Sequence, residues 1–233
     1  MNKALANIKQ LLGEQATPRY QTYFERVQQM PKASRVLGRI ASAIDKEQLA
    51  DSLVEVQYAL IFAGLGFEVE FEPSGNKGPD LGIKRDGQQA IVEIMRFRKI
   101  YSGPPVLNME DENLVLPAYG NPPRDIRKSF EKILAKFPQV GNQQGIIAIW
   151  NDDEDLDEAE TETAVYNIRS DANKGILSLP TGLLFVLYGS KWIGNKQLYS
   201  FPFRYLNQPY ETWKTELEIS TVSNHVQRAL LSA

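Results

Sequence analysis

Cysteine is absent from this sequence of 233 residues, and histidine occurs once, at His225. Without cysteine the chain can form no disulfide framework, no thiolate nucleophile and no cysteine-based zinc site. Any metal site must therefore use oxygen ligands or the single histidine, which favours Mg²⁺ or Mn²⁺ over structural zinc. The lack of cysteine also favours an intracellular, cytoplasmic protein.

Long apolar runs are lacking as well. No stretch approaches the roughly 18–20 residues needed to cross a bilayer, and residues 1–10 lack the apolar segment of a signal peptide. A membrane protein is therefore not expected. The net charge of −3 argues against a protein that coats nucleic acid indiscriminately. Basic residues nevertheless gather in residues 1–44 and 124–136, whereas the acidic run 152–162 is typical of a solvated loop.

The hydrophobic pattern predicts an α/β protein with a helical extension over residues 1–44 and one domain over residues 45–233. Asp45 is the predicted N-cap of a helix that ends at Gly64 or Gly66. Strands are expected at 67–72, 80–84, 89–97, 145–150, 183–188 and 199–205, helices at 124–137 and 210–231, and a long loop at 101–123. This order predicts a three-layer α/β/α sandwich around a mixed central sheet.

A predicted hairpin brings two carboxylates together. Asp86-Gly87 is a strong signal for a two-residue turn, and counting back along both strands from this turn places Asp80 opposite Glu93. Their Cβ atoms would then lie roughly 4.5–5.5 Å apart on one face of the sheet. Two carboxylates in this arrangement repel each other unless a divalent cation lies between them or one is protonated. The pattern therefore favours a metal site.

A third oxygen ligand is available from the helix that precedes these strands. Glu55 lies in the middle of this helix, which leads directly into the first strand. We expect the middle of the helix to pack over the sheet beside Asp80. Three carboxylates, together with water and a substrate phosphate, would supply the oxygen ligands that Mg²⁺ prefers.

The segment from Glu55 to Phe97 resembles the PD-(D/E)XK nuclease superfamily, in particular its restriction-endonuclease-like and Holliday-junction-resolvase-like members. The resemblance continues through the predicted helix 124–137 and strand 145–150. It implies a Mg²⁺- or Mn²⁺-dependent DNA endonuclease with a restriction-endonuclease-like fold. It also implies that Asp80, Glu93 and Glu55 are catalytic metal ligands, with Ile94 as a further metal-binding position. The matching motifs are Ser74-Gly75-Asn76-Lys77-Gly78-Pro79-Asp80 and Ile91-Val92-Glu93-Ile94-Met95-Arg96.

One position departs from the pattern of this family. The family has a lysine two residues after the second acid, where this chain has Met95. A thioether can neither carry a positive charge nor donate a hydrogen bond. Arg96 is adjacent, but the alternation of side chains along a strand directs it to the opposite face. A basic residue from a neighbouring element could replace the lysine, and the candidates are Lys128 and Lys132, with Lys77 and Lys84 as alternatives.

The expected partner is duplex or branched DNA, and a homodimer would suit cleavage of both strands. Residues expected to contact phosphates are Lys77, Arg124, Arg127 and Lys136. Two other functions stay open. The first is a degenerate nuclease fold that binds nucleic acid or a protein without cleavage, which Met95 would explain. The second is a carboxylate-pair hydrolase such as a retaining glycosidase, although the sequence lacks an aromatic cluster suited to a sugar.

Overall fold

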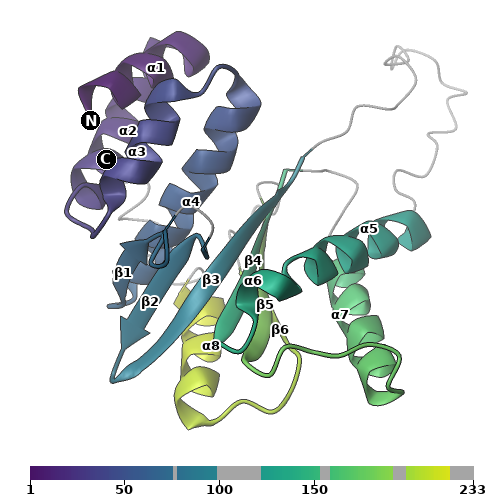
Figure 1. Cartoon of the computed structure of the whole chain (residues 1–233). Coiled ribbons are helices and arrows are strands. Elements are labelled where there is room, and N and C mark those ends of the chain that lie inside the picture. Colours follow the sequence, from purple (N-terminus) through teal and green to yellow (C-terminus); the bar gives the residue numbers. More distant parts are fainter. Residues whose placement is uncertain (76–77, 99–121, 153–157, 191–197, 221–233) are drawn as a thin grey trace, which may run out of the picture.

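Figure 1 presents the computed structural model of the chain, which describes residues 1–75, 78–98, 122–152, 158–190 and 198–220. Six strands form one mixed sheet in the order β1-β2-β3-β4-β5-β6. The β3–β4 and β4–β5 pairs are parallel, and the other three pairs are antiparallel. The strands are β1 (Glu68–Phe71), β2 (Leu81–Arg85), β3 (Gln88–Phe97), β4 (Gly145–Asn151), β5 (Leu183–Ser190) and β6 (Tyr199–Pro202).

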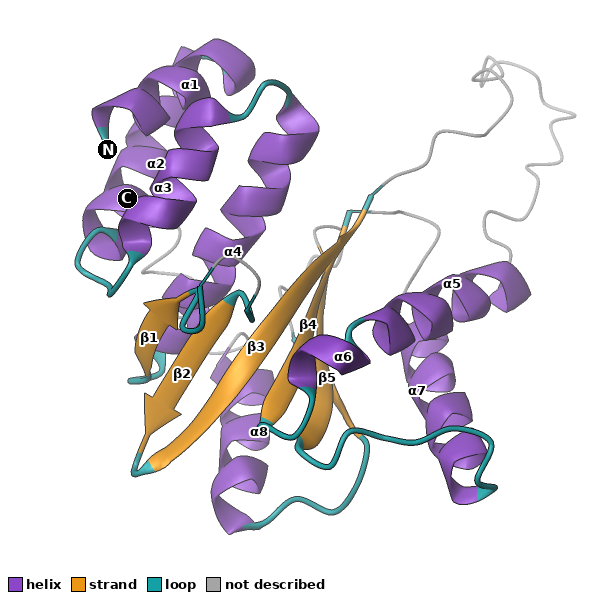
Figure 2. Ribbon diagram, viewed as in Figure 1, coloured by secondary structure: helices purple, strands orange, loops and turns teal. Residues whose placement is uncertain are grey.

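Helices cover both faces of the sheet, which confirms the predicted α/β sandwich with N-terminal helices (Figure 2). One face carries α4 (Lys46–Gly64) and α8 (Gln208–Ser220), whose apolar residues share a core with β1, β2 and β3. The other face carries α5 (Pro122–Ala135), α6 (Phe137–Val140) and α7 (Glu158–Asn173), which pack on β4 and β5. Within the described residues, no helix is long and apolar enough to cross a membrane.

The N-terminal helices extend the first layer. They are α1 (Asn2–Leu12), the 3₁₀ turn η1 (Glu14–Ala16), α2 (Thr17–Val27) and α3 (Ala33–Ser42). Their buried residues, such as Ile8, Phe24 and Ile40, belong to the same core as α4 and the sheet. The division into an extension over 1–44 and a domain over 45–233 stays a prediction, but this shared core joins the two parts physically.

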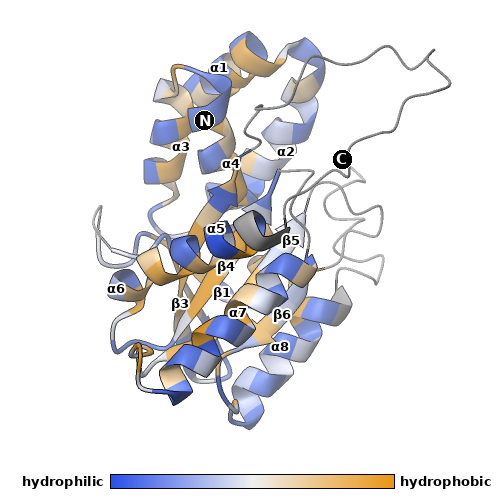
Figure 3. Ribbon diagram, turned by 90° about the vertical axis from the view of Figure 1, so that its right-hand side faces the viewer, coloured by the Kyte–Doolittle hydropathy of each residue, from blue (hydrophilic) through white to orange (hydrophobic). Residues whose placement is uncertain are grey.

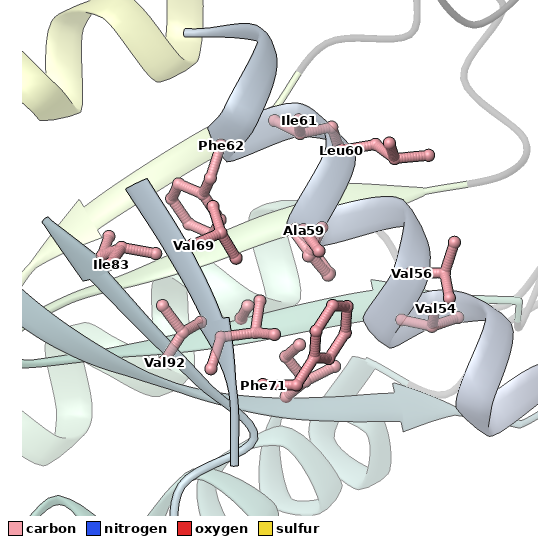
Figure 4. Close-up of a cluster of buried hydrophobic side chains, with 14 of the residues drawn as sticks. Val54, Val56, Ala59, Leu60, Ile61, Phe62, Val69, Phe71, Ile83 and Val92 are labelled. Carbon is pink, nitrogen blue, oxygen red and sulfur yellow. The ribbon is translucent and has the colours of Figure 1, made fainter. Parts of the chain in front are cut away.

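Helix α4 begins as the sequence predicts. The Asp45 side chain accepts a hydrogen bond of 2.8 Å from the backbone N–H of Gln48, which satisfies one of the free amides of the first turn. Further along the helix, Ala59 and Phe62 point at Val69 of β1 and Val92 of β3 (Figure 4). This contact fixes α4 across the first three strands, which determines where Glu55 lies.

Strands β4 and β5 form the centre of the sheet and are buried on both faces, as expected of parallel strands with helices on each side. In Figure 3 the strands carry mostly hydrophobic residues, coloured orange, whereas the outward faces of α5 and α7 are largely hydrophilic and coloured blue.

Two sequence-based boundaries were wrong. The acidic run interpreted as a loop ends inside α7, which begins at Glu158 and has Glu158 and Glu160 in its first turn. Carboxylates are favourable there because the N-terminal end of a helix carries a partial positive charge. The last helix begins at Gln208, and the structure describes it to Ser220. The predicted loop 101–123 lies outside the described residues, apart from the start of α5.

Candidate metal centre

The hairpin register is the one predicted. Arg85 pairs with Gln88, Leu81 pairs with Val92, and one further step places Asp80 opposite Glu93. The turn residues Asp86 and Gly87 have φ values of 53° and 76°, as a two-residue turn of this kind requires.

Asp80 is held directly against β3. Its Oδ2 accepts a hydrogen bond of 2.7 Å from the backbone N–H of Ile94, the residue that follows Glu93. Burial raises the pKa of Asp80, whereas this hydrogen bond and the positive charges of Lys136 and Arg39 lower it, and the net shift is upward. The Asp80 carboxylate therefore lies in a partly desolvated position where a cation is favourable.

Glu93 is 2% exposed and pairs with a lysine from the helical layer beyond the sheet. Lys136, between α5 and α6, donates from Nζ to Glu93 Oε2 at 2.9 Å. The second oxygen, Oε1, is buried and has no hydrogen-bond partner among the described residues. Burial raises the pKa of Glu93 and the neighbouring Asp80 adds to this effect, while Lys136 opposes it, and the net shift is upward. A buried carboxylate oxygen without a partner is a polar group that a cation would satisfy.

Glu55 approaches the pair from α4, on the other side of the sheet. Its carboxylate accepts a hydrogen bond from Arg39 of α3. Burial, followed by the negative charge of Asp80, raises the pKa of Glu55 to about 7, although Arg39 lowers it. The negative charge of Asp80 thus contributes to the raised pKa of both Glu55 and Glu93.

The N-terminal helices anchor the loop that leads to Asp80. The Glu72 carboxylate, almost buried, accepts hydrogen bonds from Arg35, at 2.9 Å, and from Arg39. Its backbone N–H donates to the Asp80 carbonyl at 2.9 Å and closes the loop. Glu72 has a positive φ of 43°, which is uncommon for a residue with a side chain and is held here by these contacts. This role of Arg39 and Glu72 was not predictable from the sequence, because nothing local links residues 33 positions apart.

The predicted replacements for the motif lysine lie elsewhere. The Nζ atoms of Lys128 and Lys132 lie 5.7 and 4.5 Å from the centre of the Phe97 ring, two residues beyond Met95. Met95 itself is partly buried and packs against the core formed with α5 and α7. Lys136, predicted to contact phosphate, is the lysine that reaches Glu93.

The remaining candidates are spread over the molecule. Arg96 points to the α4 side, where it pairs with Glu47 at 2.8 Å, which confirms that it faces away from Glu93. Arg127 is exposed and pairs with Glu131 at 2.7 Å. Lys84 lies 3.9 Å from Glu68 on the hairpin. Lys77 lies outside the described residues; Arg124 belongs to α5, but its side chain lies outside them too.

The three carboxylates fit a hard dication in their chemistry, and the partnerless Glu93 Oε1 leaves an oxygen for it. They are not a ready-made cage: in the part of the chain that the structure describes, no three acidic or histidine side chains converge to hold a metal ion. Arg39 and Lys136 each hold one of the carboxylates. Binding of an ion would therefore require small side-chain shifts.

Comparisons with known proteins add little. No family model and no curated protein match the chain. A chain of the CdiA-CT/CdiI toxin and immunity complex from Burkholderia pseudomallei aligns at 19% identity over 69% of this chain and 91% of that chain, with a TM-score of 0.38. A likeness at that level carries no argument, so the site rests on its own geometry.

Proposed function

We propose that the protein is a metal-dependent nuclease. In this proposal Lys136 takes the role of the motif lysine, whose position is occupied by Met95. The observation that supports this best is the contact of 2.9 Å between Lys136 Nζ and Glu93 Oε2, beside a second Glu93 oxygen that no other described residue contacts by a hydrogen bond. Lys136 thereby brings a positive charge to the sheet face of Glu93, which the uncharged Met95 cannot do.

Asp80, Glu93 and Glu55 would hold Mg²⁺ or Mn²⁺, with Ile94 as a further candidate position. A bound dication of this kind supplies an acidified water and stabilises negative charge on a phosphoryl group. In the hydrolysis, a water oxygen bonds to phosphorus while the bond to the leaving ester oxygen breaks, and the leaving oxygen takes a proton. The two products are a phosphate monoester and a free hydroxyl group.

The chain's own residues have separable tasks in this proposal. The Ile94 amide orients Asp80, since it donates to one of its two oxygens. Lys136 orients Glu93 in the same way and places an ammonium group where charge develops on phosphate. Arg39 keeps Glu55 in place from the N-terminal layer. DNA, duplex or branched, is the proposed substrate, and the exposed Arg127 of α5 is a candidate for contact with its backbone.

The test is cleavage of labelled duplex, branched and single-stranded DNA by purified protein with Mg²⁺ or Mn²⁺. We expect cleavage that stops with EDTA and that falls by about 10²–10³ in Asp80→Asn. Asp86→Asn is a matched control, because Asp86 is an exposed aspartate at the far end of the same strand. A metal-saturated preparation that cuts none of these substrates would refute the proposal.

A second function is favoured by a specific observation. Because Arg39, Lys136 and the Ile94 amide already partner the three carboxylates, the group can also be read as a structural ion-pair network. The protein would then be a degenerate nuclease fold that binds nucleic acid or a protein without cleavage. This alternative predicts salt-sensitive binding that is unaffected by EDTA and by Asp80→Asn.

A further inference from the structure

Among the described residues, no helix covers part of the sheet face beside the candidate metal centre. Helix α4 covers one face of β1, β2 and β3 (Figure 4), while α5, α6 and α7 cover the opposite face of β4 and β5 (Figure 1). On that opposite face Ile91 is 7% exposed, yet it belongs to neither of the two core clusters. Ile91 lines a surface groove and forms part of its floor.

The groove is continuous with the metal centre. Gly82 pairs with Ile91 in the hairpin register. Since side chains alternate along a strand, this pair lies on the same face as Asp80 and Glu93, one step along the sheet. A Cβ atom at Gly82 would lie 3.3 Å from the ring of Pro73, so glycine keeps the floor open at this point.

Two loops form the walls of the groove. The α2–α3 turn supplies Gln29, Met30 and Pro31, and the turn before β4 supplies residues 142–144. The volume of this open groove is about 770 Å³. This lies within the range of about 300–1,000 Å³ typical of pockets that bind small organic groups.

The lining is rich in unused amides. The side chains of Gln29, Gln89, Gln143 and Gln144 make no hydrogen bond with another described residue. Each amide offers one acceptor and two donors, which is the pattern that pairs with the edges of nucleobases.

The charges of the lining favour a neutral ligand over a phosphate. Glu70 pairs with Lys32 at 2.7 Å, and Glu68 lies 3.9 Å from Lys84. Lys84 is the one basic residue among the described residues that line the groove, and two carboxylates accompany it. Because each carboxylate is paired with a lysine, a phosphate would meet no surplus positive charge among these described residues, whereas a base would meet an apolar floor and neutral amides.

We propose that this groove binds a nucleobase adjacent to the phosphate that is cleaved and selects it through the glutamine amides. The inference rests on the proposed nuclease function, because the metal centre defines where the phosphate lies. A protein segment fits less well, since the groove combines an apolar floor with four glutamine amides that make no hydrogen bond with another described residue.

The first experiment sequences the ends produced when the protein cuts a pool of random-sequence DNA. We expect Gln143→Ala/Gln144→Ala and Gln29→Ala to reduce base preference next to the cut by about fivefold or more, because one amide–base pair discriminates by at least that much. Gln28→Ala is the matched control, since this exposed neighbour faces a different hollow, beside Met1 and Leu37. All are exposed glutamines, so the variants should fold. Preferences that stay unchanged in both groove variants would overturn the proposal.

A second measurement does not depend on cleavage. Wild-type protein in EDTA is cross-linked by light to random-sequence single-stranded DNA that contains 4-thiothymidine, and the modified peptides are identified by mass spectrometry. Cross-links to peptides 29–31 or 142–144 support the groove even if no substrate is cut, in which case only the nuclease function fails. Cleavage with cross-links confined to other surfaces overturns the groove alone. If the protein neither binds nor cuts DNA, both proposals are overturned.

Discussion

Substitution of Lys136 by methionine separates the proposed catalytic lysine from its neighbours. The change removes the ammonium group that pairs with Glu93 but keeps an unbranched apolar side chain of similar length. Lys132→Met is the matched control: it removes an ammonium group from the preceding helix, where Lys132 Nζ lies 4.5 Å from the Phe97 ring centre. Only the first substitution affects Glu93.

The size of the effect on stability follows from burial. The Glu93 side chain is 3% exposed and that of Lys136 is 22% exposed. Breaking a buried ion pair costs about 3–5 kcal/mol of stability when the remaining charge stays buried without a partner. Lys136 is partly solvated and Glu93 can take up a proton instead, so we expect a loss of about 1–3 kcal/mol at pH 8. Lys132→Met should cost about 0.5–1 kcal/mol, the value of a cation–π contact.

The stability lost in Lys136→Met should depend on pH, and the raised pKa of Glu93 determines in which direction. The pKa of Glu93 is already raised by burial, and loss of Lys136 raises it further. A carboxyl group whose pKa is raised by folding stabilises the folded state less as the pH rises through that pKa. The deficit of Lys136→Met relative to wild type should therefore be largest above the pKa of Glu93. It should vanish at low pH, where the carboxyl group is protonated in both proteins.

The assay combines urea unfolding between pH 5 and 8 with DNA cleavage at saturating Mn²⁺. We expect Lys136→Met to reduce the cleavage rate by about 10²–10³, and Lys132→Met to change it by less than about threefold. Equal losses in the two variants, or a deficit in stability that does not depend on pH, would refute the reasoning.

Three further predictions follow from the same contacts. Glu55→Gln should stabilise the protein by about 2–3 kcal/mol at pH 8, since wild type loses stability as the pH rises through the Glu55 pKa of about 7; urea unfolding at pH 5 and 8 tests this, and a difference that is larger at pH 5 would contradict it. Met95→Lys should raise the cleavage rate of Lys136→Met by at least about tenfold but add little to the rate of wild type. An unchanged rate in the double variant would argue that a positive charge on this strand face has no part in the reaction. Asp45→Ala should lower the free energy of unfolding by about 1 kcal/mol at pH 7, because it removes the cap on the Gln48 amide; an unchanged value from urea unfolding would argue that the cap contributes nothing.

The strand pairing was predictable from sequence because its determinants are local. A turn of two residues with positive φ fixes the register of β2 on β3, and the period of two then fixes the faces. The shared face of Asp80 and Glu93 follows from these two facts alone. The cap at Asp45 was predictable for the same reason, since a side chain and an amide three residues away form it.

The cations of the site were not predictable in the same way. Lys128 and Lys132 were the candidates because they lie on the helix that follows, but α5 ends at Ala135, and Lys136, just beyond it, reaches Glu93. Arg39 pairs with two carboxylates that lie on different elements, and the packing of α3 on α4 decides this contact. Helix α7 was missed because its acidic start has the composition of a loop.

The central claim is that the carboxylates of Asp80 and Glu93 share a dication. Anomalous scattering from a crystal of the full chain soaked in Mn²⁺ tests it most directly. The account predicts a manganese peak between these two side chains, with Glu55 turned toward it, and no such peak in Asp80→Asn. A wild-type crystal with Lys136 still paired to Glu93 and manganese bound elsewhere, or not at all, would contradict it.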